Sequence, residues 1–159
     1  DWNEKRVSVL TGINSRCDEL QAAILNVKID YLKKNIFYRR QIAKFYDRNL
    51  SKLPIILPSE RKNGTHSYHL YVIRLSSKLR NLFLDFMKKK GVFLGIHYYP
   101  PTHTMKSFKT KIKLKNTEYI SKQIVSLPMY PELKIKELNY IVSNMKLFFK
   151  KYKQNINIY

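Results

Sequence analysis

The sequence contains a single cysteine, Cys17. One cysteine cannot form an internal disulfide, so nothing in the sequence points to an oxidising compartment, and we expect a cytoplasmic protein. Cys17 and the four histidines also lack the spacing of a structural zinc site. We therefore expect no metal centre, and hydrogen-bonded histidines are the preferred interpretation.

Long apolar runs and glycine-rich loops are also missing. No stretch approaches the roughly 18 apolar residues that suggest a transmembrane helix, and no signal peptide is visible, so no membrane partner is expected. Only four glycines occur in 159 residues, and neither a phosphate-cradling glycine loop nor a Gly-x-Ser-x-Gly element is present. Hydrophobic residues still make up 44% and aromatic residues 13%, enough for the core of one domain. The chain begins with Asp1, which suggests a piece of a longer protein, although a processed or trimmed protein would begin in the same way.

Acidic residues are scarce, and the formal net charge is +20. Such a charge raises the hypothesis of a nucleic-acid-binding module, because cations that bind phosphates release counterions. Residues 81–159, however, hold fifteen lysines and no arginine, and arginine is the usual base-reading cation. The cations are also spread through both halves of the chain. We favour solvated lysine faces over a specific nucleic-acid site.

The longest periodic stretch covers residues 18–50 and carries two apolar stripes. This pattern predicts a long helix, bent or broken, that is covered on two sides. One small domain covers two sides of a helix poorly. We therefore interpret residues 18–50 as an interdomain helix within a C-terminal domain formed by residues 1–159, and we expect it to expose an apolar surface in the isolated chain.

The remaining elements are shorter. We expect strands at residues 7–10, 66–75 and 92–99, an extended piece at 126–131, helices at 79–90 and 117–125, and a basic irregular loop at 102–116. A closing amphipathic helix over residues 134–154 presents an apolar face of Leu138, Ile141, Val142, Met145, Phe148 and Phe149. Helices and strands without regular βαβ units indicate an α+β fold with a small, mostly antiparallel sheet.

Two groups of residues could bind ligands. Asn14 and Arg16 precede the long helix, where an amide, a guanidinium and a helix N-terminus together suit a phosphate. A capped helix beside a surface arginine explains the same residues equally well. Farther along, His97, Tyr98 and His103 surround a Pro-Pro turn. Such donors suit a ligand with hydroxyl groups, although an ordinary aromatic strand end has the same composition.

Taken together, five stretches in register resemble the DegT/DnrJ/StrS family of sugar aminotransferases. The stretches are Gly12-x-Asn14-x-Arg16-x-Asp18-Glu19-Leu20-Gln21, then Arg39 or Arg40 with Ala43 and Tyr46, His66 to Arg74, Gly95-Ile-His97-Tyr98 with Pro100 and His103, and Leu127-Pro128-Met-Tyr130-Pro131. Their order and spacing run through nearly the whole chain.

The resemblance implies an aspartate-aminotransferase-like fold of which this chain is the C-terminal small domain. It implies pyridoxal phosphate as cofactor, an amino-acid donor such as glutamate, a nucleotide-linked keto-sugar as acceptor, and a homodimer with sites at the subunit interface. By this resemblance Asn14 reaches the cofactor phosphate of the neighbouring subunit and Arg16 lies close by. His97, Tyr98 and His103 match positions near the nucleotide-sugar.

One departure from the family is large. The lysine that holds the cofactor in these enzymes precedes the Gly-x-Asn-x-Arg motif, and only eleven residues precede Gly12 here. Lys5 lacks the family's serine-rich context, so no catalytic residue is assigned. We expect the chain alone to be inactive. A basic nucleic-acid-binding module and a non-catalytic remnant of a truncated gene are the alternatives.

Overall fold

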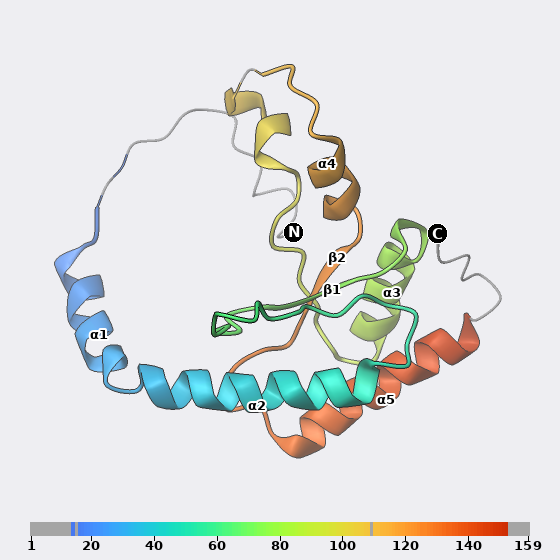
Figure 1. Ribbon diagram of the computed structural model, residues 1–159, viewed down its shortest axis with the longest axis horizontal. Helices are drawn as coiled ribbons and strands as arrows, with labels where there is room; N and C mark the ends of the chain where they lie inside the picture. The colour runs from blue at the N-terminus through green and yellow to red at the C-terminus, as the bar shows by residue number, and fades with distance from the viewer. Residues whose placement is uncertain (1–13, 15, 109, 153–159) are drawn as a thin grey trace.

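The computed structural model describes residues 14, 16–108 and 110–152, so the strand expected at residues 7–10 lies outside the described residues. Its elements follow one another along the chain as α1 (Glu19–Ile29), α2 (Leu32–Leu50), β1 (Tyr71–Arg74), α3 (Ser77–Lys89), the 3-10 turns η2 (Thr102–Thr104) and η3 (Lys106–Phe108), α4 (Lys115–Ser121), β2 (Ile124–Leu127) and α5 (Ile135–Lys151). Figure 1 shows the two strands near the middle of the molecule, with α2 and α5 crossing below them and α1 at the far end of α2. This is a small α+β fold, as the sequence predicts.

The sheet consists of β1 and β2, which pair antiparallel with Tyr71 opposite Leu127. Side chains alternate in β1: Tyr71 and Ile73 are buried, whereas Val72 and Arg74 are half-buried. This alternation turns one face of the strand to the core. Ile56 and Gly95 each add one isolated bridge, to Arg74 and Ser126 respectively.

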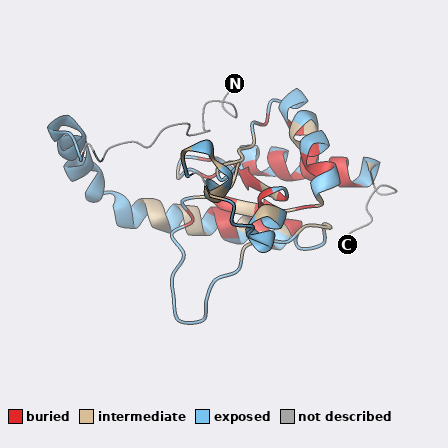
Figure 2. Ribbon diagram, turned by 90° about the horizontal axis from the view of Figure 1, so that it is seen from above, coloured by how far each residue is buried: buried red, intermediate tan, exposed pale blue. Residues whose placement is uncertain are grey.

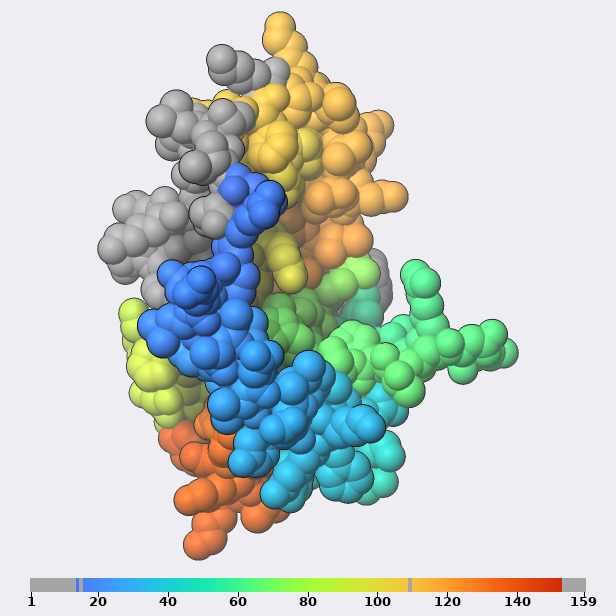
Figure 3. Space-filling model, turned by 90° about the vertical axis from the view of Figure 1, so that its left-hand side faces the viewer, coloured from blue at the N-terminus to red at the C-terminus, as the bar shows by residue number. Residues whose placement is uncertain are grey.

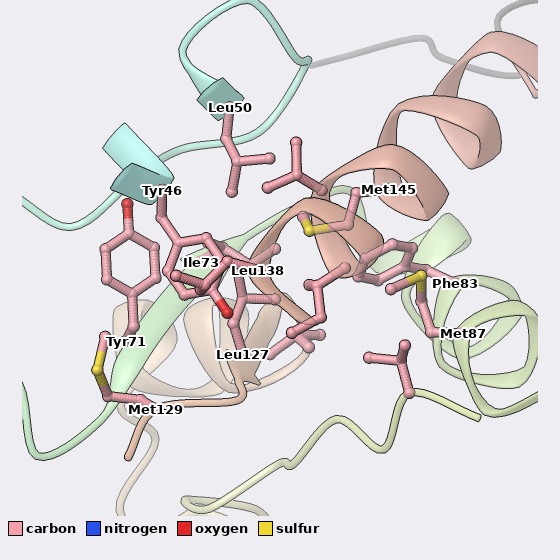
Figure 4. Close-up of a cluster of buried hydrophobic side chains, with 14 of the residues drawn as sticks. Tyr46, Leu50, Tyr71, Ile73, Phe83, Met87, Leu127, Met129, Leu138 and Met145 are labelled. Carbon is pink, nitrogen blue, oxygen red and sulfur yellow. The ribbon is translucent and has the colours of Figure 1, made fainter. Parts of the chain in front are cut away.

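Buried side chains from the strands and from α2, α3 and α5 form one hydrophobic core (Figure 4). Phe83 of α3 meets Phe148 of α5 with ring centroids 5.0 Å apart in an edge-to-face arrangement, the geometry that aromatic pairs prefer. Every residue expected on the apolar face of the closing helix is buried: Leu138, Ile141, Val142, Met145, Phe148 and Phe149. That prediction is confirmed.

Residues 18–50 form two helices rather than one. Asp18 caps α1: its Oδ1 accepts the Leu20 N–H at 2.8 Å, while Gln21 Oε1 accepts the Asp18 N–H at 3.3 Å. This capping box satisfies amides that a helix start leaves unpaired. The chain breaks at Asp30–Tyr31, without proline or glycine. Figure 1 shows α1 turned away from the line of α2.

The expected apolar surface is present on α1. All eleven residues of this helix are described and none is buried. Leu20 is 71% exposed, Val27 64% and Ile29 65%, and Figure 2 shows the exposed surface continuing into the start of α2. The apolar stripes are therefore uncovered along α1, whereas their continuation at Ile42, Ala43 and Leu50 of α2 is buried in the core. The predicted apolar surface is confirmed for α1.

Several boundaries differ from those expected. The strand expected at 66–75 is limited to Tyr71–Arg74, because Tyr68 has a φ of 49° and a left-handed residue cannot continue a strand. The strand expected at 92–99 is reduced to the bridge at Gly95. The short helix begins at Lys115 with Leu114 as its cap, instead of at Thr117. The basic loop contains the two 3-10 turns.

Candidate functional site

Asn14 and Arg16 lie in the segment that leads into α1, and both side chains are exposed. Asn14 Oδ1 accepts the Arg16 N–H at 3.1 Å, which leaves Nδ2 as the donor of this amide for a ligand. Arg16 has a φ of 61°, a left-handed conformation that non-glycine residues adopt rarely. The turn presents one amide and one guanidinium side by side in sequence, and both are donors that suit an anionic group.

The helix end behind these residues does not add to an anion site as expected. The Asp18 side chain already accepts hydrogen bonds from amides of the first turn, including the Leu20 N–H, and Glu19 adds a second carboxylate there. Acidic side chains at a helix N-terminus stabilise the helix dipole, but their negative charge repels an anionic ligand. Asn14 and Arg16 therefore remain the exposed donors of this segment that could bind an anionic group.

His97 is held against β2. Its Nδ1 lies 2.8 Å from Ser126 Oγ, and its ring lies over Gly95, where an added Cβ would come within 2.6 Å of His97 Cε1. Gly95 also exchanges two main-chain hydrogen bonds with Ser126, of 2.7 and 3.1 Å. A glycine at this position lets the imidazole approach the backbone closely. Residues 95 and 126 thus both help to orient the ring.

The two tyrosines after His97 differ in their surroundings. Tyr98 is 69% exposed, so its ring and hydroxyl are accessible to a ligand. The Tyr99 ring stacks near Arg80, with Arg80 Cζ 5.1 Å from the ring centroid. Arg80 itself is buried and donates to the Ser121 carbonyl oxygen at 2.9 Å. Burial lowers the pKa of the Arg80 guanidinium from its ordinary value, and Arg80 ties the chain around Tyr99 to α4.

His103 is engaged by a carboxylate. Its Nε2 lies 3.1 Å from Glu118 Oε1, and its side chain is only 11% exposed. The His103 hydrogen bond, followed by the Leu114 N–H, lowers the pKa of the Glu118 carboxyl. This contact joins η2 to α4, so His103 has a structural partner in the position where the sequence suggested a ligand contact.

The five candidate residues, Asn14, Arg16, His97, Tyr98 and His103, do not lie together in one site. Figure 1 shows the segment leading into α1 well apart from the chain that precedes η2. His97 and Tyr98 share one end of the sheet, and His103 belongs to the loop beyond it. Within residues 14, 16–108 and 110–152, no group of three or more His, Cys, Asp or Glu residues is placed to hold a metal, and no helix is long and apolar enough to cross a membrane.

Sequence reasoning missed the residues that position these side chains. Ser126 orients His97, Glu118 holds His103, and Arg80 supports Tyr99. Each partner is separated from its target by 15 or more positions, so no local pattern connects them. The one available signal is the position of Ser126, which directly precedes the Leu127-Pro128 motif and begins the extended piece expected at residues 126–131.

Comparisons with known proteins agree with the motif order. The profile of the DegT/DnrJ/EryC1/StrS aminotransferase family matches residues 1–146. A dTDP-3-amino-3,6-dideoxy-alpha-D-galactopyranose transaminase from Aneurinibacillus thermoaerophilus is 33% identical over 142 residues, which are 88% of this chain and 39% of the relative. A UDP-N-acetyl-3-dehydro-alpha-D-glucosamine 3-aminotransferase from Acidithiobacillus ferrooxidans is 30% identical over 144 residues, 89% of this chain and 38% of the relative.

Solved structures of the same family share the fold. A DegT/DnrJ/EryC1/StrS aminotransferase from Brucella abortus matches with a TM-score of 0.75 and 27% identity, over 86% of this chain and 37% of that protein. The chain thus spans about two fifths of the length of the relatives it matches. The profile match covers most of the sequence and agrees with the five motifs in register. This chain belongs to the DegT/DnrJ/EryC1/StrS aminotransferase family.

Proposed function

We propose that this chain is the C-terminal part of a pyridoxal-phosphate-dependent aminotransferase that moves an amino group from an amino acid, glutamate, to a nucleotide-linked keto-sugar in the cytoplasm. The observation that carries this proposal is the Asn14–Arg16 turn directly ahead of an uncovered apolar helix. The Asn14–Arg16 turn offers hydrogen-bond donors to an anion, and the uncovered helix α1 offers an apolar surface to the rest of an enzyme.

The uncovered helix supports a larger assembly. Isolated helices as short as α1 are marginal in water, and packing of an apolar face supplies most helix stability in proteins. Residues of α1 such as Leu20 and Ile29 remain largely exposed, and contiguous apolar surface marks an interaction site. We assign this surface to the remaining part of the aminotransferase, which also supplies the lysine that holds the cofactor.

The residues present fit one part of the cofactor. The amide of Asn14 and the guanidinium of Arg16 are exposed donors and suit the phosphate group, since charge-assisted hydrogen bonds to phosphate are among the strong ones in proteins. When bound, pyridoxal phosphate acts as the electron sink of amino transfer. The role of this chain is to bind and orient the phosphate, and in our proposal Asn14 does so across the interface of a homodimer.

The sugar end of the site is assigned to His97 and Tyr98. The imidazole is oriented by Ser126, and an oriented ring nitrogen and an exposed phenol can exchange hydrogen bonds with sugar hydroxyls. His103 contributes by fixing the loop through Glu118. In this role it shapes the edge of the site and does not itself contact the substrate.

A chimera tests the proposal. Residues 14–152 of this chain would replace the matching segment of the transaminase from Aneurinibacillus thermoaerophilus, and cofactor affinity and amino-sugar formation would be measured. We expect the chimera to bind pyridoxal phosphate and to form product. In the chimera, Asn14→Ala should weaken cofactor binding by about 10- to 100-fold, because a hydrogen bond to a charged group contributes about 1.5–3 kcal/mol.

The control is Asn139→Ala, an exposed asparagine of α5, which should leave cofactor affinity unchanged. In mixed dimers the Asn14→Ala defect should occur in the site opposite the substituted subunit. A folded chimera in which Asn14→Ala binds the cofactor as tightly as the parent would contradict the assignment, and a defect confined to the substituted subunit's own site would contradict the arrangement across the interface.

A further inference from the structure

The loop and helix before β2 carry a dense positive charge. Residues 106–122, the basic segment, contain six lysines and one acid, Glu118. Six lysines against one acid leave the segment with a formal charge of +5, and Glu118 lies 3.1 Å from His103. The side chains of Lys106, Lys111, Lys113, Lys115 and Lys122 are exposed.

Exposed apolar side chains lie between these lysines. Phe108 is 57% exposed, Ile112 63%, Leu114 44% and Tyr119 56%. Figure 3 shows the basic segment, coloured gold to orange, along the upper edge of the molecule. Lysines alternate with Ile112 and Leu114, so apolar and cationic groups reach solvent from the same short stretch of chain.

Hydrogen bonds order both ends of α4 within the basic segment. Glu118 Oε1 accepts the Leu114 N–H at 3.0 Å, and the Glu118 N–H donates to the Leu114 carbonyl at 2.9 Å. Arg80 anchors the other end of α4 through the Ser121 carbonyl at 2.9 Å. The backbone at Leu114 is therefore fixed at the start of α4, with its side chain 44% exposed.

We propose that the basic segment docks the protein on an anionic lipid surface. Lysines close to such a surface are attracted to acidic headgroups, and aliphatic and aromatic side chains gain free energy by entering the boundary between headgroups and acyl chains. This inference goes beyond the aminotransferase proposal and does not depend on it. It departs from the sequence-based expectation of no membrane partner, which rested on the lack of spanning segments and signal peptides.

The mixture of side chains favours lipid over nucleic acid. Single-stranded nucleic acids are bound by aromatic stacking and by arginine, and bases in duplex DNA are read mainly by arginine and amide side chains. The basic segment contains no arginine, and Ile112 and Leu114 occupy the positions between its lysines. Aliphatic side chains cannot stack on bases, but they gain from burial among acyl chains.

Vesicle flotation of the full chain tests the proposal. The partition coefficient would be measured on vesicles of phosphatidylcholine alone and of phosphatidylcholine mixed with phosphatidylglycerol. We expect tighter binding to the anionic vesicles that weakens with added salt. The triple variant Lys111→Gln, Lys113→Gln, Lys115→Gln should lower the partition coefficient at least about tenfold, because each lysine near an anionic surface contributes roughly fivefold.

Two matched variants separate this surface from the rest of the chain. The triple variant Lys88→Gln, Lys89→Gln, Lys136→Gln removes the same charge from exposed sites elsewhere and should change the partition coefficient less than about twofold, since those lysines lie away from the docked surface. The pair Ile112→Ser, Leu114→Ser should weaken binding to anionic vesicles about tenfold. The pair Leu20→Ser, Ile24→Ser on α1 should lower only the weak binding to neutral vesicles and should leave the preference for anionic vesicles unchanged.

Three outcomes would overturn the proposal that the basic segment docks on anionic lipid. Equal losses from the two lysine triples would mean that the net charge, and not this segment, governs binding. Binding to single-stranded RNA that depends on the same lysines but exceeds binding to vesicles would assign the surface to nucleic acid. Absence of binding to anionic vesicles would refute the proposal and leave the chimera test of the aminotransferase unaffected. Circular dichroism of each variant verifies that the fold is intact.

Discussion

Nη1 of Arg39 lies 2.7 Å from the carbonyl oxygen of Met129, ninety positions farther along the chain. The same nitrogen lies 3.2 Å from the carbonyl of His69 and 3.4 Å from that of Tyr68. One guanidinium from α2 thus joins the turn before β1 to the segment after β2. Arg39, which the sequence indicates only as part of a family motif, therefore connects three parts of the fold.

Replacement of Arg39 should therefore reduce stability. We expect Arg39→Ala to lower the free energy of unfolding by about 1.5–3 kcal/mol, the range for hydrogen bonds that involve a charged group. Urea unfolding followed by circular dichroism measures the change. Arg48→Ala, at an exposed position of the same helix, is the control and should change stability by less than about 0.5 kcal/mol. Equal losses in the two variants would contradict the role of Arg39.

Buried tyrosines should make the fold sensitive to alkali. Desolvation, followed by the hydrogen bond to Asp47 Oδ1 at 2.5 Å, raises the pKa of Tyr71 far above its ordinary value of 10.0. Desolvation and a Glu60 contact raise the pKa of Tyr68 to about 12. Because the folded pKa values exceed the unfolded ones, their stabilisation is complete below pH 10 and is lost as the pH rises through the folded values.

The free energy of unfolding, measured with guanidinium chloride at increasing pH, should fall above pH 10. Tyr71→Phe removes one titrating group, so the decline in its unfolding free energy should be shallower than in the parent, although the variant loses about 1 kcal/mol at neutral pH with its hydrogen bond. A parent protein of constant stability from pH 10 to 12 would argue against these buried phenols.

The His103–Glu118 contact should be visible in an acid titration. The contact lowers the pKa of Glu118 below its usual 4.5, so its stabilisation is present above the unfolded pKa and is lost as the pH falls through the folded value. In His103→Ala the pKa of Glu118 should rise towards 4.5, which side-chain NMR measures directly. His66→Ala serves as the control, because His66 contacts Tyr68 instead. An unchanged Glu118 pKa in His103→Ala would argue against the contact.

Binding to duplex DNA should be weak and non-specific. Dispersed lysines attract phosphates but do not read base edges, and the part of the chain after Arg80 contains no arginine. In fluorescence anisotropy titrations we expect complexes at low salt that dissociate by physiological salt for every sequence tested. Tight binding to one sequence at that salt would favour the nucleic-acid-binding module over the aminotransferase.

The purified chain should not transaminate on its own. In the proposed function it supplies donors for a phosphate and for sugar hydroxyls, but no lysine in it is assigned to hold the cofactor. Incubation with pyridoxal phosphate, glutamate and a nucleotide keto-sugar should give no amino-sugar in a chromatographic assay. A complete family enzyme in the same mixture is the positive control. Sustained product formation by the chain alone would show that one of its own lysines is catalytic.

Local patterns in the sequence were enough to predict the helices that have a clear apolar face. They were also enough to identify the protein family. The 3.6-residue periodicity of α5 identified all six apolar residues of its face that are buried, because burial on a helix follows from spacing within a few turns. The five motifs identified the aminotransferase family, which the match over residues 1–146 supports. The exposed face of α1 also followed from the sequence, since two apolar stripes exceed what one small domain covers.

Only the tertiary structure decided the limits of the strands and the surroundings of the candidate side chains. The left-handed conformation of Tyr68 and the single bridge at Gly95 shorten two expected strands. Glu118 holds His103, and Ser126 orients His97. These contacts join residues that are far apart in sequence, and their geometry depends on how α4 and β2 pack against the rest of the fold. Periodicity and spacing describe neighbours along one element, so they carry no information about such pairs.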